Sequence, residues 1–207
     1  MLKLKEEKIE DKNKNFLSPL TFKKQEIIID ESFYNTNNII KGGRKTGKTE
    51  KVFIPAFVNC KNAAIYIDYE KEGFIEISKK CKDIQIIDIK NINKEEFRKL
   101  LEENKKIYIN IDRYNKNHLL NLNNFFNLLY LFSKEGFLKN EKINVFIDNF
   151  QYMSKLDKLP DLLMTSYIFK FTIGVHYSKQ LESFYGDLIV NNIKENSISY
   201  DVEKQFI

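Results

Sequence analysis

Short apolar runs alternate along the chain with longer segments in which apolar side chains recur at helical spacing. A run that is apolar at nearly every position is typical of a strand buried on both faces of a parallel sheet. Such runs predict strands at residues 38–41, 63–68, 84–89, 106–112, 143–148, 168–175 and 197–200. The segments between them predict helices at residues 49–59, 71–80, 94–104, 117–134, 160–166 and 179–191. Strands that alternate with helices indicate an α/β domain, a three-layer sandwich with a mainly parallel sheet and helices on both faces.

The amino-terminal residues 1–24 are polar and rich in lysine, which predicts a loosely ordered arm. The segment from Gln25 to Asp30 predicts an edge strand ahead of the first buried one. No linker, repeat or low-complexity tract divides the rest, so we expect one domain over residues 25–207. In the long helix at 117–134, an apolar stripe is expected to face the core: Leu120, Phe125, Leu128, Leu129 and Phe132.

The composition is that of an ordinary globular domain, with 43% hydrophobic and 30% charged residues. No apolar run approaches the ~18 residues of a membrane span, and the amino terminus is charged. We therefore expect a cytoplasmic protein without a transmembrane segment. The net charge of +5 comes from interspersed lysine and glutamate, so a solvated mixed surface explains it as well as contact with DNA does.

The chemistry concentrates at residues 42–49, Gly-Gly-Arg-Lys-Thr-Gly-Lys-Thr, which fit the P-loop pattern G-x-x-x-x-G-K-[ST] at every required position. Glycine allows a tight turn whose N–H groups approach phosphate oxygens without a Cβ in the way. A strand precedes the loop and a helix follows it, the order that places N–H groups and a helix dipole against an anion. The residues predicted to bind the phosphates of a nucleotide are Gly42, Gly43, Arg44, Lys45, Thr46, Gly47, Lys48 and Thr49.

Two of these residues have individual predicted roles. Lys48 is expected to reach the β- and γ-phosphates, and the Thr49 hydroxyl to be a ligand of Mg²⁺. A flexible, lysine-rich surface loop that matches the pattern by chance is the alternative interpretation.

A P-loop needs a carboxylate opposite it to help hold magnesium. We predict Asp148 for this role, because it ends the apolar strand at 143–148 and ligands gather at the carboxyl ends of parallel strands. Asp68 and Asp112 end apolar strands too and compete for the role. An aspartate that merely caps the following turn is the alternative for Asp148.

The residue after Asp148 is Asn149, where many P-loop motors have a glutamate that activates the attacking water. An amide can orient a water molecule but cannot take its proton. General base catalysis contributes roughly 10²–10⁴-fold, so its loss predicts a slow hydrolase or a simple nucleotide binder.

Four blocks of sequence in the same order resemble one family, the coupling proteins of type IV secretion systems, which are conjugative DNA-transfer ATPases among the FtsK-like motors. Their motifs Val-Val-Ile-Pro, Asp-Pro-Lys-Gly-Glu, Asp-Glu-Phe-Ala-Asn and Leu-Gln-Ser-Leu-Ser-Gln-Leu are similar to residues 52–55 (Val-Phe-Ile-Pro), 67–72 (Ile-Asp-Tyr-Glu-Lys-Glu), 148–152 (Asp-Asn-Phe-Gln-Tyr) and 174–181 (Gly-Val-His-Tyr-Ser-Lys-Gln-Leu). A Tyr-Gly pair at 185–186 also matches, and Lys158 to Thr165 lies between the last two blocks at a compatible distance.

The resemblance implies a RecA-like P-loop NTPase fold that uses ATP and Mg²⁺. It further implies a homo-oligomer, a hexameric ring that draws DNA through its centre, with an arginine supplied by a neighbouring subunit; Arg98 and Arg113 are the candidates outside the P-loop. It places His176 where the family has a glutamine that senses the γ-phosphate, with Gln180 near the same phosphate or at a subunit boundary. Proteins of a secretion or conjugation apparatus would be partners, and the chain would lie in the cytoplasm, peripheral to the inner face of the membrane.

The departures from the family define the alternatives. Asn149 and His176 replace catalytic residues, and the family's inserted helical domain has no room between Asp68 and the strand near Ile107. The leading hypothesis is therefore an ATP-binding motor core with weak or lost hydrolysis. The second is a non-hydrolysing regulatory or interaction subunit of a secretion or DNA-transfer apparatus. A small P-loop kinase is a third, disfavoured because the chain shows no arginine-rich lid.

Overall fold

The computed structural model of the protein describes residues 20–23, 26–29, 37–136, 142–177 and 179–202. Its centre is a seven-stranded sheet in the order β5-β6-β4-β7-β8-β3-β9, and every neighbouring pair of strands is parallel. The strands are β3 (Asn37–Lys41), β4 (Ala64–Asp68), β5 (Gln85–Asp88), β6 (Lys106–Asn110), β7 (Ile143–Asp148), β8 (Phe169–Val175) and β9 (Ser197–Asp201). All seven strands predicted from apolar runs are confirmed, with ends that shift by one or two residues.

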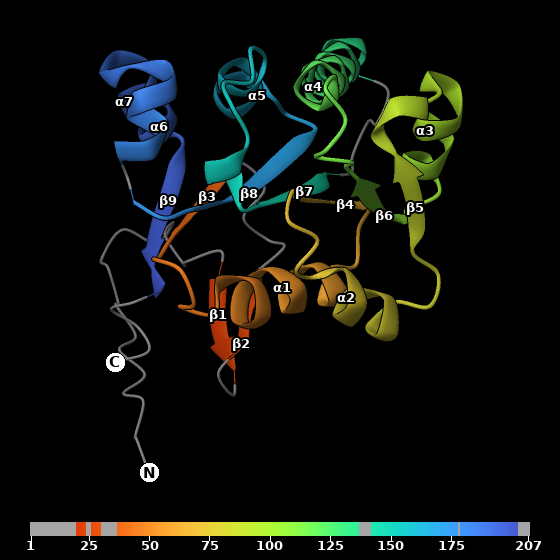
Figure 1. The fold of residues 1–207 in the computed structure, drawn as a ribbon, viewed down its shortest axis with the longest axis horizontal. Coiled ribbons are helices and arrows are strands. Elements are labelled where there is room, and N and C mark those ends of the chain that lie inside the picture. Colours follow the sequence, from red (N-terminus) through yellow and green to blue (C-terminus); the bar gives the residue numbers. More distant parts are fainter. Residues whose placement is uncertain (1–19, 24–25, 30–36, 137–141, 178, 203–207) are drawn as a thin grey trace.

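Helices cover both faces of this sheet (Figure 1). One face carries η1 (Lys48–Phe53), α1 (Ile54–Asn59) and α2 (Phe74–Lys80). The other carries α3 (Lys94–Glu102), α4 (His118–Glu135), α5 (Leu159–Thr165), α6 (Lys179–Tyr185) and α7 (Asp187–Glu195). Single turns of 3₁₀-helix, η2 (Ile89–Asn91) and η3 (Phe150–Tyr152), follow β5 and β7. The predicted three-layer α/β architecture is therefore confirmed.

Strand β4 shows why continuous apolar runs are required here. Its alternate side chains enter opposite layers, with Ile65 and Ile67 in the core under α3 to α7 and with Ala64 and Tyr66 in the core under α1 and α2. All four are fully buried. A strand with a polar face would leave one of the two helical layers without a packing surface.

The order of the strands decides which of their carboxyl ends meet. The P-loop strand β3 and the Asp148 strand β7 are separated by β8, which pairs with both. On the other side of β7, Asp68 of β4 is the register partner of Asp148. This arrangement agrees with the RecA-like P-loop fold predicted from the sequence. It brings the P-loop and two strand-ending aspartates together at the carboxyl ends of the strands.

The helix after the P-loop begins differently from the prediction. Residues 48–53 form a π-helix, and the α-helix starts at Ile54 with Pro55 in its first turn. Proline lacks an N–H and crowds the preceding turn of a helix, and Pro55 stands in the first turn of α1, the part of an α-helix that tolerates proline best.

The predicted helix at 179–191 is wrong as a single element. It is two helices, α6 and α7, joined at Gly186, whose φ of 78° lies in the left-handed region. A residue in that conformation ends a right-handed helix, and glycine adopts it without the steric cost of a Cβ.

Two further predictions need correction. The segment 25–30 is not an edge of the main sheet: β2 (Glu26–Ile29) pairs with β1 (Leu20–Lys23) in a separate antiparallel hairpin that lies beside η1 and α1. Strand β1 also falls within the predicted arm, of which residues 1–19 lie outside the described part. In α4, Leu120 is 59% exposed and faces solvent, whereas Phe125, Leu129 and Phe132 are buried and Leu128 is partly buried against the core.

Among the described residues, no helix combines the length and apolarity that a membrane crossing requires.

Candidate functional site

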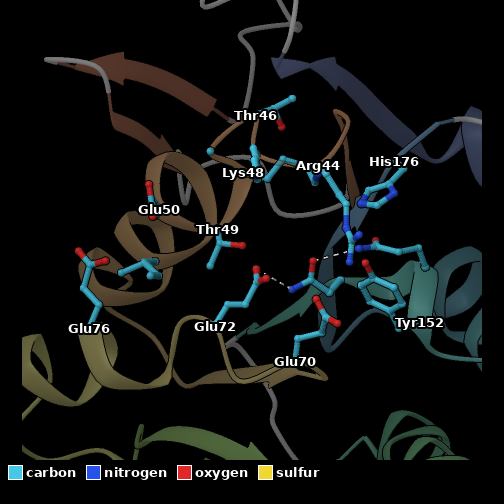
Figure 2. Close-up of a pocket in the computed structure, with 15 residues that line it drawn as sticks. Arg44, Thr46, Lys48, Thr49, Glu50, Glu70, Glu72, Glu76, Tyr152 and His176 are labelled. Atoms are coloured by element: carbon cyan, nitrogen blue, oxygen red, sulfur yellow. Dashed lines mark hydrogen bonds between the residues drawn. The ribbon is translucent and has the colours of Figure 1, made fainter.

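The P-loop forms one wall of a cavity of about 680 Å³ (Figure 2), within the size range of small-molecule sites. The opposite wall comes from the loop after β4, the start of α2 and the segment after β7. His176, just after β8, lines it as well. The structure therefore brings together P-loop residues and residues 149 and 176, which are more than a hundred positions apart in the sequence. The lining side chains include Arg44, Lys45, Thr46, Lys48, Thr49, Glu70, Glu72, Asn149, Tyr152 and His176.

The P-loop turn depends on Gly47 and Lys48. Gly47 has a φ of 82°, so a side chain here would be strained, and its backbone carbonyl accepts the N–H of Lys51 at 2.8 Å. Lys48 begins η1 and is only 6% exposed. Its ammonium group donates to the backbone carbonyls of Gly42 and, at 2.9 Å, Gly43. Lys48 is therefore held inside the P-loop, the loop that is predicted to bind the phosphates.

Asp148 ends β7 and is fully buried. Its Oδ2 accepts the Tyr66 hydroxyl at 3.0 Å, while its buried Oδ1 has no hydrogen-bond partner among the described residues. Burial, and then the nearby charge of Asp68, raise the pKa of Asp148 to about 7, although the hydroxyls of Thr49 and Tyr66 and the charge of Lys48 oppose the shift. An unsatisfied carboxylate oxygen next to Thr49 is an environment that a cation would stabilise.

The competing aspartates have other partners. Asp68 is also buried, but it accepts N–H groups from Glu70 at 3.1 Å and Gly73 at 2.8 Å and the Tyr108 hydroxyl at 3.3 Å. Its carboxylate therefore fixes the loop that follows β4. Asp112 is exposed and forms an ion pair with Lys90 at 3.1 Å, outside the cavity.

Asn149 lies against the cavity wall with a φ of 60°, in the left-handed region that asparagine tolerates better than most residues. Its side-chain oxygen accepts from Gln151 Nε2 at 3.0 Å, and its Nδ2 donates to Glu72 Oε2 at 3.5 Å. The amide is therefore held in place between two pocket residues.

His176 packs edge-on against Tyr152, with ring centroids 6.2 Å apart. Burial, and then the positive charges of Lys48 and Arg44, lower the pKa of His176, so the ring is neutral near pH 7. Gln180 does not line the cavity; its side-chain oxygen instead accepts the backbone N–H of His176 at 2.9 Å. That Gln180 lies near the γ-phosphate or at a subunit boundary stays a prediction; in this structure its side chain holds the segment that carries His176.

The two arginine candidates lie in different places. Arg98 is on α3 and pairs with Glu102 at 3.2 Å and Glu135 at 3.5 Å, in the helical layer opposite the P-loop helix. Arg113, after β6, pairs with Glu70 at 3.5 Å, and Glu70 lines the cavity.

Sequence reasoning missed the acidic wall. Glu70, Glu72 and Glu76 line the cavity opposite the P-loop, and the first two follow directly after a buried parallel strand, which is the signal that could have found them. Tyr66 carried no such signal, because its contact with Asp148 depends on the pairing register of β4 and β7.

Gly174 on β8 provides a test of the packing behind the site. A Cβ at this position would lie 3.0 Å from the Phe53 ring and 3.5 Å from Asp148 Oδ1. We expect Gly174→Ala to lower the free energy of unfolding by about 1–3 kcal/mol, the usual cost of overpacking. Urea denaturation measures it, and the cost should shrink in a Phe53→Leu background, where the ring is removed. An equal cost in both backgrounds would locate the strain elsewhere.

Comparisons with known proteins find likenesses among solved structures. No protein-family model matches the chain, and no curated protein does. Among solved structures, the chain is similar to the genome packaging NTPase B204 from Sulfolobus turreted icosahedral virus 2, solved in complex with AMP. The similarity covers 84% of this chain and 96% of that chain, with 14% sequence identity and a TM-score of 0.43. The resemblance to coupling proteins stays a prediction.

Proposed function

We propose that the chain binds ATP with Mg²⁺ in the P-loop cavity and hydrolyses it weakly. The observation that carries the proposal is that Lys48 and Thr49 line a cavity large enough for a nucleotide and lie close to Asp148, a fully buried carboxylate that is itself not among the residues lining the cavity. A chance match to the P-loop pattern would not be expected to place its lysine and threonine beside a strand-ending carboxylate 99 residues later in sequence.

The residues fit a magnesium ion. Thr49 and Asp148 would hold it, and the unpartnered Oδ1 of Asp148 is the oxygen that gains most from a cation. The ion would supply charge neutralisation to the β- and γ-phosphates. Arg44, Lys45 and Lys48 add positive charge from the P-loop side of the cavity.

Asn149 accounts for the weakness of the hydrolysis. Its amide can orient a water molecule, but the position has no group that accepts a proton. Turnover is therefore expected to be weak unless another carboxylate of the cavity takes the proton that this position cannot accept.

The metal assignment predicts that ATP binding depends on Mg²⁺ through Thr49. We expect Thr49→Val to lower the affinity for ATP measured with Mg²⁺ by roughly tenfold or more, because one contact to a charged group is lost. The affinity measured with EDTA should be nearly unchanged. Fluorescence titration with an ATP analogue measures both. Thr165→Val, on α5 and outside the cavity, is the matched control. Equal losses with and without the metal would remove Thr49 from the metal site.

At a finer level, we propose a motor core of the conjugative coupling type, cytoplasmic and peripheral to the inner face of the membrane. The four ordered sequence blocks and the strand order of the sheet support this proposal. It requires a ring of subunits that acts on DNA, with Arg98 or Arg113 supplied to the cavity of a neighbouring subunit; both arginines form ion pairs within their own subunit, Arg113 with Glu70 at the rim of its own cavity. Light scattering with and without ATP, and turnover with and without DNA, test these points; a monomer indifferent to both ligands would contradict them.

The second candidate is a non-hydrolysing subunit of a secretion or DNA-transfer apparatus. Asn149 favours it, because the amide is held by two hydrogen bonds at the position where the family has its catalytic carboxylate. Tight ATP binding without turnover would support this candidate over the motor core.

A further inference from the structure

The wall opposite the P-loop carries three carboxylates, from Glu70, Glu72 and Glu76 (Figure 2). The hydrolysis proposed above needs a group that takes a proton from the attacking water, and Asn149 cannot do so. Since carboxylates are available in the same cavity, the geometry of each decides whether it could serve.

The loop that presents Glu70 and Glu72 is held firmly. The Asp68 carboxylate accepts N–H groups from both ends of the loop, at Glu70 and at Gly73, with distances of 3.1 and 2.8 Å. Between them, Lys71 has a φ of 61°, which reverses the chain direction. Asp68 is itself buried and held by the Tyr108 hydroxyl. Glu72 is therefore presented from a fixed turn and not from a free loop.

Glu72 faces Asn149. The Asn149 amide donates to Glu72 Oε2 at 3.5 Å, and the Glu72 side chain points into the space below Thr49 (Figure 2). That contact joins residues 77 positions apart in sequence. A carboxylate thus lies beside the position at which the resembling family has its catalytic glutamate, but it comes from the neighbouring strand β4.

The other two carboxylates are engaged differently. Glu70 pairs with Arg113 at 3.5 Å, and Glu76 pairs with Lys80 at 2.7 Å along α2. Burial, and then the charge of Glu72, raise the pKa of Glu70 although Arg113 opposes the shift, so the ion pair alone does not exclude Glu70. What distinguishes Glu72 is its hydrogen bond with Asn149. Glu72 combines solvent access with contact to Asn149.

We propose that Glu72 is the general base for ATP hydrolysis and that Asn149 orients the same water, an inference that rests on the proposed function. The water oxygen forms a bond to the γ-phosphorus while its proton passes to the Glu72 carboxylate. The bond between the γ-phosphorus and the β,γ-bridging oxygen breaks, which leaves ADP and inorganic phosphate, and the proton on Glu72 is then released to solvent. No redox partner or further reactant is involved.

The test is a single-turnover assay with ATP and Mg²⁺, together with ATP affinity measured separately. Glu72→Gln is expected to slow the chemical step by roughly 10²–10⁴-fold and to leave affinity within about twofold of the wild-type value, because glutamine keeps the shape and loses the base. Glu96→Gln, which removes an exposed carboxylate on α3 outside the cavity, is the matched control and should hydrolyse at the wild-type rate. Hydrolysis by Glu72→Gln at the wild-type rate would overturn the assignment.

A rescue experiment separates a catalytic role from a structural one. Placing Asn149→Glu in the Glu72→Gln background restores a carboxylate on the other side of the same contact, so we expect hydrolysis to recover by at least about tenfold. No recovery would mean that Glu72→Gln acts by distorting the site. If the wild-type chain binds ATP but never hydrolyses it, this inference fails while nucleotide binding stands; if it binds no ATP, both proposals fail.

Discussion

Replacing Lys48 by alanine is expected to reduce the affinity of the chain for ATP with Mg²⁺ by roughly 10- to 150-fold, because hydrogen bonds to a charged group contribute about 1.5–3 kcal/mol. Lys48 is the buried cation of the P-loop, 6% exposed and aimed by two loop carbonyls. Its ammonium would move from these carbonyls toward the phosphates, or bridge both, when a nucleotide binds. The measurement is an equilibrium titration with a fluorescent ATP analogue.

The same substitution has a cost in the free protein. The carbonyls of Gly42 and Gly43 lose a donor when Lys48 is truncated, so we also expect a decrease of about 1–3 kcal/mol in the free energy of unfolding. Lys51→Ala is the matched control, since it removes a lysine one turn further along η1 that does not line the cavity. Equal affinities for Lys48→Ala and the wild type would rule out the phosphate role of this residue.

The second large effect is a pH dependence of stability that arises from Asp148. Its pKa is raised in the folded state to about 7, from an unfolded value near 3.9, so the folded protein binds this proton more tightly. The contribution of this proton to the free energy of unfolding is fully present below about pH 4 and is lost as the pH rises through about 7. Three units of pKa correspond to about 4 kcal/mol.

Urea denaturation between pH 4 and pH 9 in the presence of EDTA measures this loss, with Asp148→Asn as the comparison. The wild type should lose stability toward alkaline pH more steeply than the variant, which has no proton to release at position 148, although Asp68, whose pKa burial also raises, titrates in both proteins. Mg²⁺ favours the charged carboxylate, so it should stabilise the wild type more at pH 9 than at pH 5 and have little effect on Asp148→Asn. If the stability of the two proteins changed with pH in the same way, the pKa of Asp148 would not be raised in the folded protein, contrary to this account.

The fold could be predicted because each strand and most helices are visible in a short, continuous stretch of the sequence. The run at residues 143–148 is apolar at four of its six positions, with Asn144 and the final Asp148 as the polar ones, and it corresponds to β7 residue for residue. The break between α6 and α7 at Gly186 was not predicted, because apolar side chains continue at helical spacing on both sides of this glycine. The break is visible only in the left-handed φ of Gly186. Leu120 was assigned to the core, although it lies five residues before Phe125 and therefore about 140° around the helix from the buried face.

The site was predictable only in part, for a related reason. The P-loop is a contiguous motif, and Asp148 ends an apolar strand, so both are visible in the sequence. The contacts of Tyr66 with Asp148 and of Glu72 with Asn149 span 82 and 77 positions and depend on which strands are neighbours. Sequence spacing does not encode strand order, and the acidic wall therefore emerged only from the structure.

The central claim is that the P-loop and Asp148 together form a pocket for a triphosphate and its metal. Isothermal titration of ATP into the wild-type chain, with Mg²⁺ and then with EDTA, tests it most directly. We expect saturable binding of one nucleotide per chain that weakens when the metal is chelated. The absence of binding heat and of competition by ATP against a fluorescent analogue, in a protein shown to be folded, would contradict the claim.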